Sequence, residues 1–141
     1  MSLIDGGKGI FHHTYIDNLV DAILLAMTTK QAVGCSFDIT DGDATITWKH
    51  YFNDLAQLAG KPPITQTIPM PLASLLSRLM MIRYHLTKKP PLLSPTAVHI
   101  FANTTKISIH HAQHLLGYQP KIEYSTALDR IAAWLQKENL I

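Results

Sequence analysis

The spacing of apolar residues changes within residues 10–26, IFHHTYIDNLVDAILLA. The first part alternates apolar or β-prone residues with polar ones, which predicts a short strand over residues 10–16. From Asn18 onward the apolar residues recur at helical spacing to about Thr29, and Asn18 with Asp21 forms a variant of the capping box. This part of the chain is therefore expected to be a strand that runs directly into a helix.

Turn residues and helical spacing divide the rest of the chain into short elements. A second strand is predicted over Ser36–Thr40, followed by a turn at Asp41 and Gly42, and residues 64–69 (ITQTIP) are β-prone. Helical spacing predicts further helices within residues 48–60, 71–89, 94–103, 109–117 and 124–140. The expected N-caps of four of them are Thr47, Ser94, Ser108 and Ser125, and the expected helix-ending glycines are Gly60 and Gly117.

The longest predicted helix, within residues 71–89, is both apolar and basic. Its apolar residues at helical spacing are Leu72, Leu75, Leu76, Leu79 and Ile82, and its basic residues are Arg78, Arg83, Lys88 and Lys89. The elements together predict a helix-rich α+β fold with two or three short strands. A length of 141 residues suits a single domain over residues 1–141.

The composition is that of one globular domain in a reducing compartment. Of the residues, 47% are hydrophobic and 16% are charged. The single cysteine, Cys35, excludes a disulfide within the chain. Asp5 and Lys8 interrupt any apolar run near the N-terminus, so no signal peptide is expected, and no apolar stretch is long enough to span a bilayer. A cytoplasmic location is the expectation.

The net charge of +2 is unevenly distributed along the chain. No acidic residue occurs between Asp54 and Glu123, and this interval carries Lys61, Arg78, Arg83, Lys88, Lys89, Lys106 and Lys121. Such an imbalance favours an anionic ligand, an anionic lipid surface or an acidic partner, and a solvated basic face explains it equally well. Aromatic residues that could stack on bases are few in this interval, so no nucleic acid partner is expected.

Two patterns suggest catalytic chemistry or metal binding, and neither is complete. His110 and His114 are one helical turn apart, but a zinc site needs a third ligand, so no metal site is expected. Tyr84 and Lys88 match Tyr-x-x-x-Lys, in which a lysine assists proton transfer by a tyrosine. The glycine-rich phosphate-binding turn that accompanies this dyad in dehydrogenases is missing, so the match is interpreted as chance.

Three segments together resemble the extended short-chain dehydrogenases/reductases, also known as the NAD-dependent epimerase/dehydratase family. Residues 4–26 (IDGGKGIFHHTYIDNLVDAILLA) resemble the segment that follows the catalytic helix of these enzymes. Residues 34–60 (GCSFDITDGDATITWKHYFNDLAQLAG) resemble the next strand, turn and helix. Residues 107–136 (ISIHHAQHLLGYQPKIEYSTALDRIAAWLQ) resemble the closing signature, in which Leu-Gly-Tyr-x-Pro precedes a helix ending in Trp-Leu. The three motifs occur in the family's order and spacing.

The resemblance implies that the complete protein is an NAD(P)-dependent oxidoreductase or epimerase. Its N-terminal Rossmann-type domain, which binds NAD or NADP, would lie upstream and be absent from this chain. Residues 1–141 would form the C-terminal substrate-binding lobe, with the last helix and strand of the nucleotide-binding sheet. No catalytic, cofactor-binding or metal-binding residue is then expected here, and the fragment alone should bind no coenzyme and catalyse no reaction.

Two differences from the sequences of sugar-nucleotide epimerases indicate which branch of the family the chain resembles. Phe11, His12 and His13 occupy the positions of their Arg-Asp-[FY] motif, so the arginine that grips a phosphate is missing. Residues 68–93 are apolar and basic, and resemble the 3β-hydroxysteroid dehydrogenase-like branch. The resemblance therefore implies action on the hydroxyl or keto group of a sterol-like or long-chain β-keto substrate. The same lobe of a nucleoside-diphosphate-sugar epimerase or dehydratase is the alternative, and a non-enzymatic basic module that binds lipid or a partner is a further one.

The expected substrate-binding residues lie in two places: His12, His13 and Tyr15 near the start of the first helix, and Leu76, Met80, Met81 and Tyr84 in the longest helix. Ordinary surface or core roles explain them at least as well. The expected partners are the protein's own Rossmann domain, a small-molecule substrate and, peripherally, a membrane surface. The fragment is also expected to self-associate through an exposed apolar face of Ser36–Thr40 and the helix Asn18–Met27.

Overall fold

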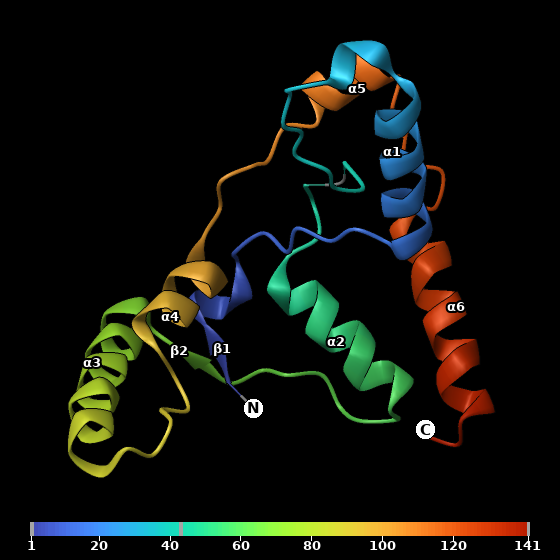
Figure 1. The fold of residues 1–141 in the computed structure, drawn as a ribbon. Coiled ribbons are helices and arrows are strands. Elements are labelled where there is room, and N and C mark those ends of the chain that lie inside the picture. The colour runs from blue at the N-terminus through green and yellow to red at the C-terminus, as the bar shows by residue number, and fades with distance from the viewer. Residues whose placement is uncertain (1, 43, 141) are drawn as a thin grey trace. The chain divides into compact units, whose positions relative to one another are not determined.

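The computed structural model describes residues 2–42 and 44–140, and over this part of the chain the fold is helix-rich (Figure 1). The described residues form six α-helices and one parallel two-stranded sheet. The helices are α1 Ile16–Thr28, α2 Trp48–Leu58, α3 Met70–Thr87, α4 Pro95–Ala102, α5 His110–Leu116 and α6 Tyr124–Lys137. Strand β1, Leu3–Ile4, pairs Leu3 with Thr67 and Ile4 with Ile68 of β2, Thr67–Ile68. The expectation of a helix-rich fold with few short strands is confirmed.

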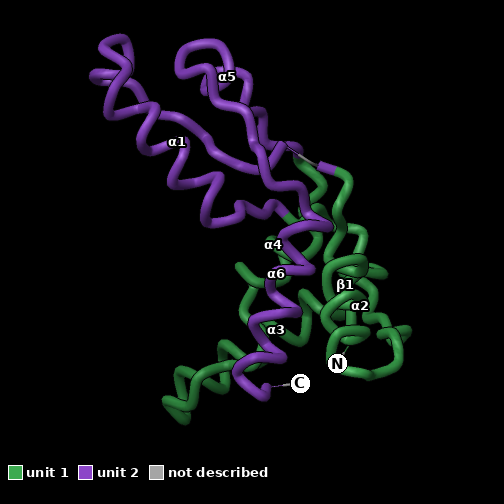
Figure 2. Tube along the Cα trace, turned by 90° about the vertical axis from the view of Figure 1, so that its right-hand side faces the viewer, with its two compact units in different colours: residues 1–11, 45–105 green, residues 12–44, 106–141 purple. Residues whose placement is uncertain are grey.

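The chain divides into two compact units, coloured separately in Figure 2. Unit 1 comprises Met1–Phe11 and Thr45–Thr105, and unit 2 comprises His12–Ala44 and Lys106–Ile141. Each unit is therefore built from two segments that are distant in sequence. The expectation of a single domain over residues 1–141 stays a prediction.

Unit 1 has a small aliphatic core beside a group of aromatic rings. Ile4, Ala73 and Val98 form the buried core, which brings together β1, α3 and α4. Gly9 lies so close to the end of α4 that a Cβ atom there would overlap the carbonyl oxygen of Phe101. The absence of a side chain at Gly9 is thus what allows the N-terminal segment to pass α4 at this distance.

Unit 2 has its core between α1 and α5. Buried Ala22 of α1 packs with Ala112 and Leu116 of α5 and with Tyr118, which is 0% exposed. Gly117 ends α5 with a φ of 67°, the left-handed conformation that glycine adopts without strain. Small residues on both helices allow the two backbones to approach closely.

Both strands that alternation predicted before Asp41 are wrong. Of residues 10–16, Ile10 alone forms a bridge, antiparallel with Thr47, and the helix begins at Ile16. Residues 36–40 belong to no strand, although Phe37 and Ile39 pack against the core of unit 2. A strand is defined by hydrogen bonds to a neighbouring strand, and the described part of the chain offers none to these segments.

The expected caps divide into those that the structure confirms and those that it corrects. Thr47 Oγ1 accepts from His50 N at 3.2 Å, and Ser94 Oγ accepts from Ala97 N at 3.1 Å, so both predicted N-caps are confirmed. Ser108 Oγ accepts from His110 N, but the cap position itself is Ile109. Ser125 lies within α6, which begins one residue earlier, so that predicted cap is wrong.

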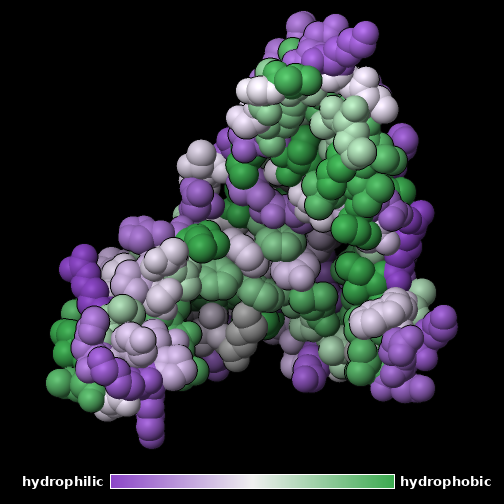
Figure 3. Space-filling view, viewed as in Figure 1, coloured by the Kyte–Doolittle hydropathy of each residue, from purple (hydrophilic) through white to green (hydrophobic). Residues whose placement is uncertain are grey.

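The apolar stripes of α1 and α3 face outward, and hydrophobic residues are visible over α1 in Figure 3. On α1, Ile16, Val20, Ile23, Leu24 and Met27 are between 44% and 77% exposed. On α3, Leu72, Leu75, Leu79, Ile82 and Leu86 are between 49% and 81% exposed, whereas Ala73 and Ser77 are fully buried. The exposed apolar face expected on the first helix is confirmed. Within the described residues, no helix combines the length and the apolar character needed to cross a bilayer.

Candidate functional site

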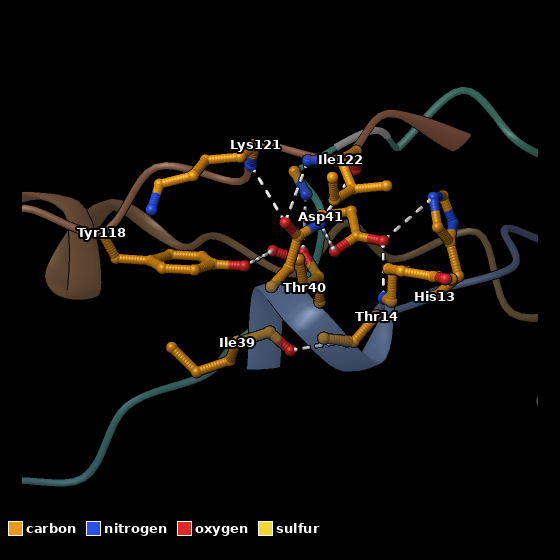
Figure 4. A network of polar contacts seen from close by, with 11 residues as sticks. His13, Thr14, Ile39, Thr40, Asp41, Tyr118, Lys121 and Ile122 are labelled. Carbon is orange, nitrogen blue, oxygen red and sulfur yellow. Dashed lines mark hydrogen bonds and ion pairs between the residues drawn. The ribbon is translucent and has the colours of Figure 1, made fainter. Parts of the chain in front are cut away.

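A polar network surrounds the start of α1 in unit 2, and Figure 4 shows Asp41, Tyr118 and Lys121 among its members. Asn18 is its centre. The Asn18 side chain is 1% exposed. Its Nδ2 donates to Asp41 Oδ1 at 2.7 Å and to the Ile122 carbonyl at 2.8 Å. Its Oδ1 accepts from the backbone N–H groups of Lys121 and Ile122, both at 3.0 Å. One side chain thereby joins three segments that are remote in sequence.

The carboxylate of Asp41 lies at the N-terminal end of α1. Its Oδ2 accepts from the Tyr15 backbone N–H at 2.8 Å, and its other oxygen accepts from Asn18. A negative charge there is favoured by the unpaired N–H groups and the dipole of the helix. His13 Nε2 lies 3.7 Å from Asp41 Oδ2, and the two side chains are 10% and 2% exposed. Asp41 therefore fixes the backbone of the segment that carries the predicted residues His13 and Tyr15.

Tyr118 closes the network from the end of α5. Its hydroxyl donates to the Thr40 carbonyl at 3.1 Å. Burial raises the pKa of Tyr118 to about 12, with smaller contributions from the negative charges of Asp41 and Asp21. A phenol stays protonated at neutral pH, so the Tyr118 hydroxyl can donate to the Thr40 carbonyl and hold this loop in place.

The other predicted residues of this site lie at its border. The guanidinium of Arg130 lies over the ring of Tyr15, 5.7 Å from the ring centroid. Arg130 also forms an ion pair with Asp17, with a distance of 2.9 Å. His12 and Tyr15 are half-buried. All of these groups are held by hydrogen bonds or packing, and the arrangement can orient a polar ligand group at the start of α1. Whether it does so stays a prediction.

The four residues predicted on the longest helix lie in unit 1. Leu76, Met80 and Met81 are half-buried, and Tyr84 is 36% exposed. By helical spacing they lie on the side of α3 that also carries buried Ala73 and Ser77. These four therefore share a helix face, whereas His12, His13 and Tyr15 belong to unit 2. Their role in binding substrate stays a prediction.

Two incomplete sequence patterns can now be described in three dimensions. The rings of His110 and His114 stack with centroids 6.2 Å apart, and no group of three metal-ligating side chains occurs within residues 2–42 and 44–140. Lys88 is the left-handed C-cap of α3, with a φ of 56°, and is not part of the helix. Tyr84 and Lys88 thus lack the regular helical geometry that the Tyr-x-x-x-Lys pattern requires.

Sequence reasoning missed the central role of Asn18 and of Asp41. Asn18 was expected to cap the helix, but the cap position is Tyr15 and Asn18 is buried one turn inside α1. Asp41 was expected only in a turn, although it supplies the carboxylate at the helix start. The available signal was a polar residue on the side of a helix that also carries buried Ala22, since a buried amide must find hydrogen-bond partners.

Comparison with known proteins gives relatives along nearly the whole chain. The sterol-4-alpha-carboxylate 3-dehydrogenase erg26, decarboxylating, of Schizosaccharomyces pombe is 28% identical, and the match covers 92% of this chain and 39% of that protein. The corresponding Candida albicans enzyme is 26% identical, and the uncharacterized protein YbjS of Escherichia coli is 28% identical; each match covers 93% of this chain and 40% of the relative. No protein-family profile matches the chain.

A protein of known crystal structure has a similar fold. The crystal structure of gox2253 matches with a TM-score of 0.63 at 16% identity, over 92% of this chain and 38% of that one. The chain thus spans about two fifths of the length of the relatives that it matches. The resemblance seen in the motifs is confirmed to this extent: nearly the whole chain is similar to the C-terminal part of two sterol-4-alpha-carboxylate 3-dehydrogenases.

Proposed function

We propose that the chain is the substrate-binding part of an NAD(P)-dependent oxidoreductase that acts on the hydroxyl or keto group of an apolar substrate, sterol-like or long-chain β-keto. The observation that carries this proposal is the match of 92% and 93% of the chain to two sterol dehydrogenases. Because the chain spans only 39% and 40% of those enzymes, the activity is proposed for the longer protein that contains it.

Two groups of side chains are proposed to contact the substrate. The aliphatic and thioether side chains of Leu76, Met80 and Met81 supply apolar surface that adapts to an irregular hydrocarbon. His12, His13 and Tyr15 supply polar groups, and the hydrogen bond from Tyr15 N to Asp41 supports their role because it fixes the backbone that carries them. The two groups belong to different units, so each is proposed by itself as a contact of the substrate.

The nucleotide-binding domain of the longer protein is proposed to cover the apolar face of α1 and to pair with the extended residues 36–40. The support is the exposed stripe of α1, from Ile16 to Met27, beside a β-prone segment without a neighbouring strand among the described residues. NAD or NADP would bind to that domain. In the isolated chain the same face is expected to cause self-association. Sedimentation of the 141-residue chain tests this, and a monomer at high concentration would count against it.

The test of the activity uses the longer protein. Its coding region, extended upstream, is expected to carry a glycine-rich phosphate-binding turn and a Tyr-x-x-x-Lys dyad. The purified product should reduce NAD⁺ or NADP⁺ with a 3β-hydroxysterol, and the 141-residue chain alone should not. Thermal protection by a nucleoside-diphosphate sugar but not by a sterol would replace this proposal with the epimerase or dehydratase alternative.

A second candidate role is peripheral contact with an anionic membrane through α3. The exposed residues Leu72, Leu75, Leu79 and Ile82 form one stripe, and by helical spacing Arg78 and Arg83 lie on its two sides. Arginine side chains at the edge of an apolar stripe can reach phosphate groups while their methylenes stay on the apolar surface. Liposomes containing anionic lipid should sediment with the chain at low salt and release it at high salt. Equal binding to neutral liposomes would contradict the electrostatic part of this role.

A further inference from the structure

The exposed apolar stripe on α3 follows a heptad repeat. Its members succeed one another at intervals of three, four, three and four residues: Leu72, Leu75, Leu79, Ile82 and Leu86. This alternation is that of the a and d positions along the seam of a coiled coil. At about 100° per residue the five side chains span only about 80° of the helix circumference. A face that packs on a protein core is usually at least about 100° wide, so the stripe has the width of a contact with one other helix.

The opposite face of α3 already holds the helix in unit 1. Ala73 and Ser77 are fully buried there, and Ala73 packs with Ile4 and Val98 in the core of the unit. The stripe is therefore not the surface by which α3 is attached to the rest of unit 1. A contiguous apolar surface of this kind, bordered by charged side chains, marks an interaction site more often than a bare surface.

The charged residues beside the stripe all have the same sign. Arg78 and Arg83 occupy g and e positions of the repeat, which flank a and d, and both side chains are exposed. No acidic residue occurs among residues 55–122. In the part of the chain that the structure describes, no acidic side chain forms an ion pair with either arginine. Two cations next to the seam are thus available to a partner.

A second copy of the chain does not supply the complementary charge. If α3 paired with α3 of another copy, the arginines at e and g would lie next to arginines in either orientation, which disfavours that pair. The exposed stripe of α1 has acidic neighbours, but they are already paired. Asp17 forms an ion pair with Arg130 at 2.9 Å. Asp21 forms one with Lys121 at 2.7 Å. A partner helix must therefore bring acidic residues of its own.

We propose that the exposed stripe of α3 binds one amphipathic helix of a partner protein, with leucine-like residues at a and d and with aspartate or glutamate at the flanking positions. The apolar side chains of the two helices interdigitate, and the acidic side chains pair with Arg78 and Arg83. An anionic membrane competes for the same stripe. A bilayer imposes no heptad spacing on the helix that lies on it, so the repeat is the observation that favours a helix.

The direct test uses two synthetic peptides, each about three heptads long, which is enough to form a helix. Both carry leucine at a and d, and they differ at e and g, where one has glutamate and the other has lysine. Each peptide is labelled at one end, and its binding is followed by fluorescence anisotropy. The 141-residue chain is kept below the concentration at which it self-associates. At low salt the acidic peptide should bind at least about tenfold more tightly than the basic one, and high salt should reduce this difference.

Two exposed leucines provide a matched pair of variants. Leu79→Gln changes the centre of the seam, where the side chain is 53% exposed, and glutamine keeps the helix propensity. It should weaken binding of the acidic peptide about tenfold, because the burial of one leucine is lost. Leu92→Gln makes the same change at a residue that is 96% exposed and lies beyond α3. Its binding should stay within about twofold of the parent, as for a neutral surface change.

Reversal of the flanking charge tests the choice of partner apart from the apolar contact. A variant that combines Arg78→Glu with Arg83→Glu should prefer the basic peptide over the acidic one. The proposal is overturned if the parent binds both peptides equally at low salt or neither of them, if Leu79→Gln binds as the parent does, or if the double variant keeps the preference for the acidic peptide. Should Leu79→Gln not fold, as judged by circular dichroism, the double variant decides.

Vesicles of phosphatidylcholine with phosphatidylserine separate the two occupants. If these vesicles bind the parent and not Leu79→Gln, while the acidic peptide binds neither, the occupant is a membrane and the proposal is overturned. None of these measurements involves coenzyme or turnover, so their outcome is distinct from that of the test of the oxidoreductase activity.

Discussion

Each of the two compact units is stabilised internally by its own set of interactions. Unit 2 adds a buried amide and a buried carboxylate to its apolar core, because Asn18 and Asp41 connect α1 to two loops through hydrogen bonds of 2.7–3.0 Å. Unit 1 depends on contact between apolar surfaces, with Ala73 and Val98 at its core and stacked rings around Trp48. Hydrogen bonds are directional and apolar contact is not. The loops of unit 2 are therefore expected to be rigid where these hydrogen bonds hold them.

The largest effect is expected from Asn18→Leu in unit 2. The change leaves the N–H groups of Lys121 and Ile122, and one oxygen of Asp41, without their partner. Several unsatisfied groups at roughly 1–3 kcal/mol each predict a loss of about 4 kcal/mol in the free energy of unfolding. Urea denaturation measures it. Asn103→Ala is the control: its side chain accepts a local bond from Thr105 N, its backbone carbonyl still accepts from Ile10 N in the variant, and the change should cost less than about 1 kcal/mol. If both variants lost a similar free energy of unfolding, the buried network around Asn18 would not be a special source of stability in unit 2.

The next largest loss of stability is expected in unit 1, from adding a side chain at Gly9. Gly9→Ala would put a Cβ atom onto the carbonyl oxygen of Phe101, a backbone atom that cannot move independently. The expected loss in the free energy of unfolding is about 3 kcal/mol. Gly34→Ala is the control: a Cβ atom there meets nothing within 4 Å, and the φ of +80° alone should cost about 1–2 kcal/mol. Equal losses would show that the close approach of Gly9 to α4 is not required.

A pH dependence is expected from Tyr118 in unit 2. Its pKa rises from 10.0 to about 12 in the folded protein, so the folded state favours the protonated phenol. This contribution is fully present below pH 10 and is lost as the pH rises from 10 to 12. Over that window the parent should lose roughly 2 kcal/mol more than Tyr118→Phe, in which the other tyrosines still titrate. Parallel pH profiles of the two proteins, measured by urea denaturation, would show that Tyr118 is not desolvated.

The smallest effect is expected at an exposed ion pair. Arg130 and Asp17 are 2.9 Å apart with side chains that are 48% and 59% exposed. Arg130→Gln should therefore lower the midpoint of thermal unfolding only slightly, and less at high salt, because solvent screens an exposed ion pair. Thermal denaturation at low and high salt measures both. A large loss would mean that the polar stabilisation of unit 2 extends beyond its buried network.

Sequence patterns located helices better than strands. The segments predicted for α2, α4 and α5 contain the observed helices, and Thr47 and Ser94 cap them as expected, because a capping hydrogen bond is made within a few residues. The predicted strands over residues 10–16 and 36–40 did not form, because a strand needs a partner that local sequence does not specify. Among the described residues, the two short strands pair residues that are more than sixty positions apart.

The candidate site was found only in part. His13 and Tyr15 lie within the network around Asp41, but no local pattern linked Asn18 to Lys121 and Ile122. The stripe of leucines on α3 gave the helix correctly, yet the structure turns most of it outward and buries Ala73 and Ser77 instead. A periodic pattern identifies an apolar face and does not say what covers it.

The sequence by itself located most of the helices, the caps Thr47 and Ser94 and the resemblance to known dehydrogenases, because these depend on neighbouring residues and on motifs that keep their order. Only the tertiary structure decided that Asn18 is buried and that α1 and α3 expose apolar faces. Burial and pairing depend on which remote segments meet, and those encounters follow from the packing of the whole chain.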